Sequence, residues 1–151
     1  MLFTTLSLLI IFAGYIIALG AVTVIDMHGF LGRNSSYWTN ATIVSHKITK
    51  PLIWLGTFLL SIGTIWFYNL TGITRISYIH WSIISILIVN GLFLSFWVSP
   101  RLIALEKSGK SHELLSQSIQ QKILISFIFS FIGWWGRLTL FIYHLVTLGI
   151  R

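Results

Sequence analysis

Four long apolar runs dominate the sequence and constrain its fold more than any other feature. They extend from Leu2 to Ile25, from Pro51 to Leu70, from Ile76 to Val98 and from Ile123 to Ile150. A bilayer core of about 30 Å is crossed by about 20 helical residues, and each run reaches that length. The sequence therefore predicts an all-α integral membrane protein, a four-helix bundle that forms one transmembrane domain over residues 1–151.

The low content of charged residues excludes a soluble domain. Only 9% of the residues are charged and 56% are hydrophobic, whereas ordinary globular domains carry about 25% charged residues. The first run lacks a positively charged start and is longer than the apolar part of a signal peptide, so we expect a retained helix. The absence of cysteine excludes disulfides and thiolate ligands.

The net charge of +7 arises from ten Lys and Arg residues against the three acids Asp26, Glu106 and Glu113. In a soluble protein this excess would indicate nucleic acid. Here the basic residues gather in two segments between apolar runs, so we expect anionic lipid headgroups as partners and no nucleic acid.

The distribution of basic residues predicts the topology. Seven of them lie in loop one (26–50) and loop three (99–122), namely Arg33, Lys47, Lys50, Arg101, Lys107, Lys110 and Lys122. The opposite face carries only Arg75 and Arg151. The positive-inside rule then places both loops in the cytoplasm and both termini outside, in the cytoplasmic (inner) membrane.

A stripe of small and polar residues runs along the fourth segment. Its members alternate at steps of four and three residues: Ser126, Ser130, Gly133, Arg137, Leu140 and His144. This spacing places them on one helix face, which should point into the bundle. Arg137 is near mid-span, where a charge costs between about 2.5 and more than 10 kcal/mol. We expect it either to bond to carbonyl groups and Asn90 or to neutralise a bound anion.

Two histidines, His80 and His144, are expected at similar depth on neighbouring helices near the outer face. Paired histidines of this kind hold haem b through its two axial positions in four-helix membrane proteins. In that case Arg137 and Asn90 would contact the cofactor. Alternatively, Asn90 bonds only to a neighbouring helix, and the histidines are interfacial residues that bond to water.

Loop one contains the densest set of polar residues, including Asp26, His28 and His46. One carboxylate and two imidazoles are suitable ligands for a divalent metal. The two histidines could instead hold a second haem, or Asp26 could pair with Arg33 or Lys47 in a surface for lipid headgroups. Pro51 is expected in the first turn of the second helix.

Small residues also predict where helices approach closely. Gly14 and Ala18 in the first run, and Gly56 and Gly63 in the second, are typical of tight helix packing in membranes.

The third run contains His80-Trp81, then Asn90-Gly91-Leu92-Phe93, then Pro100-Arg101-Leu102. This segment resembles a helix of small bacterial membrane proteins that include the copper-resistance-D type and the HemJ-type protoporphyrinogen oxidases. The resemblance covers residues 80–102. It implies a role for His80 in haem binding.

These observations lead to two main hypotheses, and they leave open whether the protein is an enzyme. The first is a small redox or electron-transfer protein that binds haem b or a metal through His80 and His144. The second is a non-enzymatic membrane subunit, or a carrier of a small anion or lipid, with Arg137 in an internal cavity. A purely structural role in a homo-oligomer or a larger membrane complex is a third possibility.

Overall fold

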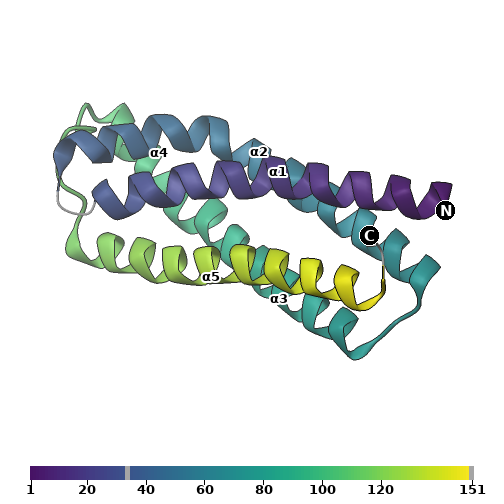
Figure 1. Ribbon diagram of the computed structural model, residues 1–151. Helices are drawn as coiled ribbons and strands as arrows, with labels where there is room; N and C mark the ends of the chain where they lie inside the picture. Colours follow the sequence, from purple (N-terminus) through teal and green to yellow (C-terminus); the bar gives the residue numbers. More distant parts are fainter. Residues whose placement is uncertain (33–34, 150–151) are drawn as a thin grey trace.

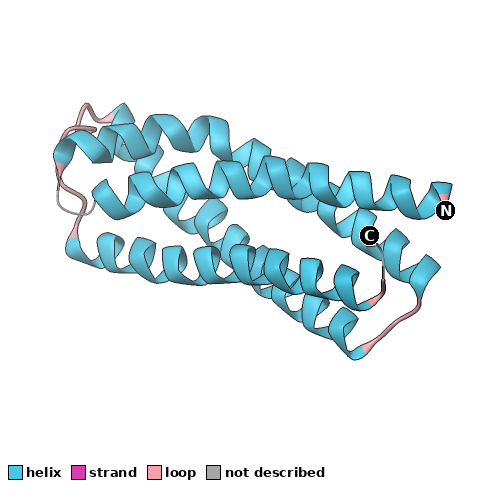
Figure 2. Ribbon diagram, in the orientation of Figure 1, coloured by secondary structure: helices cyan, strands magenta, loops and turns pink. Residues whose placement is uncertain are grey.

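The computed structural model describes residues 1–32 and 35–149, and helices joined by short connections make up this part of the chain (Figures 1 and 2). The elements are α1 (Leu2–Gly32), α2 (Ser36–Thr71), α3 (Arg75–Phe93), the π-helix η1 (Leu94–Val98), α4 (Ser99–Lys107) and α5 (Gln117–Thr147). The elements α3, η1 and α4 follow one another without a break, so they form one span.

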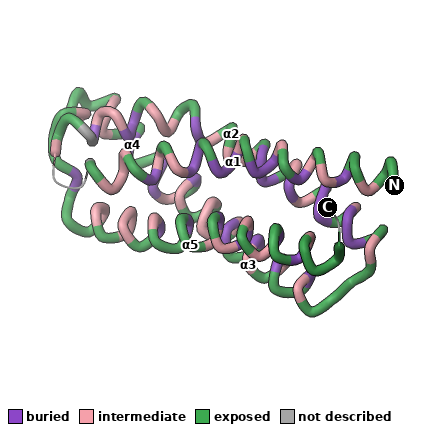
Figure 3. Tube along the Cα trace, in the orientation of Figure 1, coloured by how far each residue is buried: buried purple, intermediate pink, exposed green. Residues whose placement is uncertain are grey.

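Four helical segments are long and apolar enough to cross a membrane. They are Leu2–Leu31, Thr39–Thr71, Arg75–Lys107 and Gln117–Thr147. Large apolar side chains cover much of the outside of the bundle, while the buried residues line its interior (Figure 3). The prediction of an all-α chain with four helices long and apolar enough to cross a membrane is confirmed.

The four spans lie roughly along one axis (Figure 1). The start of α1, the end of α5 and the turn at residues 72–74 lie at one end, and the end of α1, the start of α2 and the connection at residues 108–116 lie at the other (Figure 1). We call the second end the basic end. Of the basic residues used for the topology, Arg33 and Arg151 lie outside the described residues.

The prediction that residues 26–50 form a loop is wrong. Helix α1 continues to Gly32 and α2 begins at Ser36, so Asp26, His28 and His46 all lie on helices. The third span likewise continues to Lys107, and the fourth starts at Gln117 and ends at Thr147.

These extensions are stabilised by an apolar cluster at the basic end, which is separate from the larger core cluster of the bundle. Its buried members are Ile43, Val98, Leu102 and Leu115, which come from α2, η1, α4 and the segment before α5. Burial of apolar side chains outweighs the polar composition of this segment, and several of its polar residues, among them Asp26, Thr42 and Thr49, are buried in the bundle.

Pro51 lies inside α2 and not in its first turn, which corrects a second prediction. A proline inside a helix cannot donate a hydrogen bond to the carbonyl four residues earlier. The π-helix η1 directly precedes Ser99 and Pro100, the first residues of α4, and short π-helical segments are frequent at functional sites. Both irregular positions flank the same region of the bundle.

Helices α1 and α2 form an antiparallel pair held by close glycine contacts. A Cβ atom added to Gly14 would lie 2.7 Å from the backbone nitrogen of Leu60, and one added to Gly56 would lie 2.6 Å from the Cβ of Ala18. One added to Gly63 would lie 2.8 Å from a side-chain carbon of Ile11. The predicted role of these small residues in helix packing is confirmed.

Candidate functional site

Buried polar atoms without a hydrogen-bond partner identify two sites in the described part of the bundle. Three such atoms belong to side chains at the basic end, and four belong to side chains nearer the termini. They are Asp26 Oδ2, Thr42 Oγ1 and His46 Nε2 in the first group, and His80 Nε2, Arg137 Nε, His144 Nδ1 and His144 Nε2 in the second. Each such atom costs free energy in an apolar interior, so the two groups are the places where a ligand or a proton would compensate.

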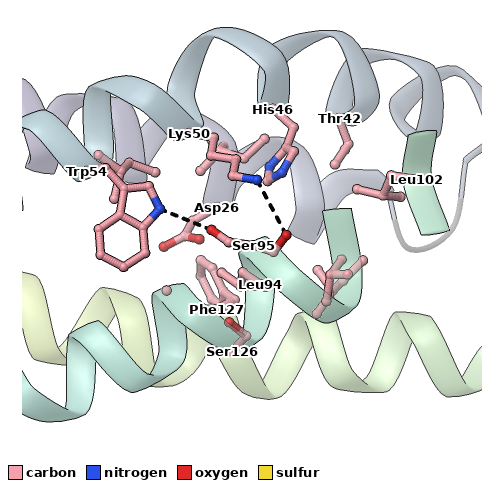
Figure 4. Close-up of a pocket in the computed structure, with 15 residues that line it drawn as sticks. Asp26, Thr42, His46, Lys50, Trp54, Leu94, Ser95, Leu102, Ser126 and Phe127 are labelled. Carbon is pink, nitrogen blue, oxygen red and sulfur yellow. Dashed lines mark hydrogen bonds between the residues drawn. The ribbon is translucent and has the colours of Figure 1, made fainter. Parts of the chain in front are cut away.

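The residues of the first group line one cavity, which we call the Asp26 cavity. Its polar lining consists of Asp26 from α1, Thr42, His46, Lys50 and Trp54 from α2, Ser95 from η1 and Ser126 from α5. Its volume is about 80 Å³. Figure 4 shows the carboxyl of Asp26 and the side chains of His46 and Lys50 directed toward this space.

Contacts between α2 and the π-helix η1 hold the wall of the Asp26 cavity in place. Lys50 donates a hydrogen bond from Nζ to the carbonyl oxygen of Ser95 at 3.4 Å, and Trp54 donates from Nε1 to the Ser95 hydroxyl at 3.1 Å (Figure 4). The single bond of Lys50 is long, and no carboxylate lies within 4.0 Å of its ammonium among the described residues. A cation and a carboxylate therefore line one cavity without pairing.

A smaller cavity of about 40 Å³ continues toward the middle of the bundle, and it shares Asp26 and Trp54 with the first. Ser130 lies beside the Asp26 carboxyl here. Asn90 also lines this space, but both ends of its amide are engaged by Ser126. The Asn90 amide nitrogen donates to the Ser126 carbonyl at 3.3 Å, and the Ser126 hydroxyl donates to the amide oxygen at 2.8 Å.

Asn90 thus links α3 to α5, in agreement with the prediction that it bonds to a neighbouring helix. It lies ten residues from His80 on the same helix, which is about 15 Å along the axis. The structure does not bring Asn90 together with the histidines.

The predicted metal ligands are only partly brought together. Asp26 and His46 line the same cavity, whereas His28 Nδ1 shares a hydrogen bond with the Ser45 hydroxyl at 3.0 Å. Among residues 1–32 and 35–149 no three His, Asp or Glu side chains are grouped in a way that could hold a metal ion. The divalent metal at these residues stays a prediction without geometric support.

The second group surrounds Arg137, which is 1% exposed. Its guanidinium donates from Nη1 to the Tyr15 hydroxyl and from Nη2 to the Thr64 hydroxyl, both at 3.0 Å. Both acceptors are neutral, and the bonds expected to Asn90 are not formed. Arg137 lines none of the cavities described above, which argues against a bound anion beside it.

His80 and His144 lie together, as the sequence predicted, with their ring centroids 6.3 Å apart. Both are buried, and Tyr68 hydrogen-bonds to His80 Nδ1 and lies against both rings. We call Arg137, Tyr15, Thr64, Tyr68, His80 and His144 the arginine–histidine cluster.

The arginine–histidine cluster fits a haem poorly. Phe67 contacts His144, Phe141 contacts His80, and both phenylalanines are buried. Together with Tyr68 they occupy the space around the two imidazoles, and a porphyrin would have to displace them. A single metal ion between the rings would require much less rearrangement.

No family model, curated protein or solved structure matches this chain. The resemblance to the copper-resistance-D and HemJ types thus stays a prediction. The functional argument rests on the geometry alone.

Several residues of the two sites were missed by sequence reasoning. Thr42, Lys50 and Trp54 were missed; together with the predicted His46 they follow one another at steps of four residues, so all four lie on one helix face, and all four line the Asp26 cavity. That spacing was a usable signal, but it is hidden when residues 26–50 are read as a loop. Tyr15, Thr64 and Tyr68 had no comparable signal, because single hydroxyls are common in membrane helices.

Proposed function

We propose that the protein is a multi-pass membrane protein that binds a small polar solute in the Asp26 cavity and carries it across the membrane. The observation that supports this most directly is that the three residues with unpartnered buried polar atoms at the basic end, Asp26, Thr42 and His46, all line one cavity. In lipid no water from outside reaches such atoms freely, so a polar ligand would supply the missing bonds.

The volume of the cavity limits the size of the solute. A water molecule occupies about 30 Å³ in the liquid, and an engineered cavity of about 150 Å³ holds benzene. A cavity of about 80 Å³ is therefore suited to a solute with only a few non-hydrogen atoms. This argues for the carrier of a small ion or polar molecule over the carrier of a lipid.

The charges in the cavity indicate the chemistry of the solute. Lys50 and His46 favour an anionic or hydrogen-bond-accepting group, and Asp26 favours a cationic or donating group. A solute with both kinds of group would satisfy the lining better than a simple anion. A small zwitterion or a hydrogen-bonding acid has this character.

Two irregular helix segments provide a physical basis for opening the cavity. Pro51 weakens α2 beside His46 and Lys50, and η1 interrupts the regular hydrogen bonding of the third span at Ser95. Local rearrangement at such positions requires fewer broken backbone bonds than in a regular helix. The arrangement supports a carrier rather than a static structural subunit.

For the orientation, we propose that the basic end faces the cytoplasm and the termini lie outside, in the cytoplasmic membrane. The described residues Lys47, Lys50, Lys107 and Lys110 belong to the helices and the connection at this end. The positive-inside rule gives the direction.

Binding to the Asp26 cavity is tested with glycine, acetate and ammonium as zwitterionic, anionic and cationic probes. Thermal unfolding of the detergent-purified protein is followed by tryptophan fluorescence, and uptake of labelled probe is measured in proteoliposomes. We expect glycine to raise the melting temperature and to enter the vesicles. Asp26→Asn and Lys50→Gln should each weaken binding by about tenfold or more, because each removes a charge-assisted hydrogen bond worth about 1.5–3 kcal/mol.

Lys47→Gln and Glu113→Gln are the matched controls. Lys47 is on the same helix as Lys50 but pairs with Glu106 at 2.6 Å, outside the cavity, and Glu113 is an exposed acid. The proposal is wrong if no probe binds the wild-type protein, or if the controls reduce binding as much as the cavity variants.

The contact between His80 and His144 supports a second candidate function. Three of their four ring nitrogens lack a partner, and imidazole is a good ligand for copper, zinc and iron. A transition-metal ion at this pair, or the iron of a haem b after rearrangement of Phe67 and Phe141, would make the protein a redox component of the membrane.

Metal analysis and an absorption spectrum of the purified protein test this second candidate. If it holds, we expect about one metal ion per chain or a Soret band, and His80→Ala and His144→Ala should each lower the metal or haem content by more than about tenfold. His112→Ala is the control, because this histidine is exposed. Wild-type protein that stays free of metal and colourless after supplementation with copper, zinc and haem would exclude it.

A further inference from the structure

Two cations that lack an acidic partner are held against the same aromatic ring at the basic end. The Arg101 guanidinium lies 3.6 Å from the centroid of the Trp97 ring, and the Lys122 ammonium lies 3.8 Å from it. Arg101 also donates from Nη1 to the Trp97 carbonyl at 2.5 Å. Cation–π contact stabilises each charge singly, but two like charges at one ring repel each other.

The acids of the chain do not neutralise this pair. Glu106 pairs with Lys47 at 2.6 Å, Glu113 pairs with Lys110 at 3.7 Å, and Asp26 lies in the cavity. These three are all the acids that the sequence contains. Among the described residues, no acidic side chain therefore neutralises the charge next to Trp97, which leaves it available to an anion from outside the protein.

The surroundings of the pair match the boundary between lipid headgroups and hydrocarbon. Phe93 stacks on Trp97 with centroids 5.3 Å apart and an interplanar angle of 16°. A shallow, mainly apolar hollow extends from Lys122 toward the middle of the span, and it is lined by Asn90, Phe93, Lys122, Ile125 and Ser126. Aromatic rings next to basic side chains at the end of a span are typical of the interface.

We propose that Arg101, Lys122 and Trp97 form a binding site for the phosphate of an anionic phospholipid. The two cations would contact the phosphate, and an acyl chain would follow the hollow over Phe93 and Ile125. A lipid fits better than a free anion because the apolar hollow continues directly from the charged pair. This site does not depend on the solute proposed for the Asp26 cavity.

Native mass spectrometry of the full chain, incubated with phosphatidylglycerol or phosphatidylcholine, tests the lipid site. We expect the wild-type protein to retain phosphatidylglycerol preferentially. The double variant Arg101→Gln/Lys122→Gln should weaken this binding by about 10- to 30-fold, because each basic contact near the membrane surface contributes about a factor of five.

The matched control is Lys107→Gln/Lys110→Gln, which removes the same charge from the same end of the protein. Equal losses in the two double variants would show diffuse electrostatic attraction and overturn the site, as would an unchanged affinity of Arg101→Gln/Lys122→Gln. Displacement of the lipid by millimolar inorganic phosphate or glycerol phosphate would show a site for free anions and would also overturn it.

A second variant keeps the test valid if the double variant does not fold. Trp97→Leu leaves both charges in place but removes the ring that positions them, and we expect it to weaken phosphatidylglycerol binding by about threefold to tenfold. Unchanged lipid preference in Trp97→Leu would contradict the proposed arrangement.

Discussion

Gly14→Ala is expected to lower the free energy of unfolding by about 3 kcal/mol, because the added methyl group has no room between α1 and α2. The new Cβ would lie 2.7 Å from the backbone nitrogen of Leu60 and 2.8 Å from the carbonyl oxygen of Gly56. Because both contacts are with backbone, no side chain can rotate away, and α1 and α2 must separate. Overpacking of this kind costs about 1–3 kcal/mol or more.

Gly20→Ala is the control for this substitution. Gly20 lies on the same helix but is exposed, and a Cβ there would meet nothing within 4 Å. Alanine is favoured over glycine in a helix by about 1 kcal/mol, so the control should be neutral or slightly stabilising. Unfolding in SDS, followed by circular dichroism, measures both. Equal stabilities of the two variants would show that α1 and α2 are not in close contact.

The sequence allowed the spans and their close contacts to be predicted, because both follow from local composition. Each apolar run had the length of a membrane helix, and small residues within such a run are typical of close helix packing in membranes. The pairing of His80 with His144 was also predictable, since matched depth on neighbouring helices brings such residues together.

The sequence did not allow the Asp26 cavity to be predicted, because the cavity depends on where α1 ends and where α2 begins. Residues 26–50 are polar enough to be interpreted as a loop, and only tertiary packing around Ile43 and Leu102 makes them helical. Once they are helical, Thr42, His46 and Lys50 share one face. The partners of Arg137 were unpredictable for a similar reason, because Tyr15 and Thr64 come from two other helices whose rotation is fixed only by packing.

Arg137→Met is expected to raise the free energy of unfolding by about 2 kcal/mol. Arg137 is a buried cation whose described hydrogen-bond partners, Tyr15 and Thr64, are neutral, and unfolding in detergent returns it to a hydrated environment. A mid-span arginine costs between about 2.5 and more than 10 kcal/mol, whereas each of its two charge-assisted hydrogen bonds contributes about 1.5–3 kcal/mol, so the middle of the first range exceeds the two bonds together. Thr64 still donates to the Leu60 carbonyl in the variant, so only the Tyr15 hydroxyl loses its partner.

Arg137→Lys separates the effect of charge from that of the two hydrogen bonds. Lysine keeps the buried charge but lacks the planar fork that reaches Tyr15 and Thr64 together, so we expect it to be less stable than the wild-type protein by about 1–3 kcal/mol. The expected order of stability is therefore methionine, arginine, lysine, measured by SDS unfolding. Methionine as the least stable of the three would show that the guanidinium is a net stabilising link between α1, α2 and α5.

The expected order also distinguishes a structural role of Arg137 from a functional one. If Arg137→Met is stable and still binds its solute in the Asp26 cavity, then the arginine is not needed for that solute. Its function would lie at the histidine pair, where its positive charge opposes the binding of another cation. A stable variant that also leaks ions in proteoliposomes would instead make Arg137 the electrostatic barrier of the bundle, since a fixed positive charge at mid-span repels protons and other cations. In either case the Arg137 guanidinium would lower the stability of the protein and would determine which ions pass through it or bind inside it.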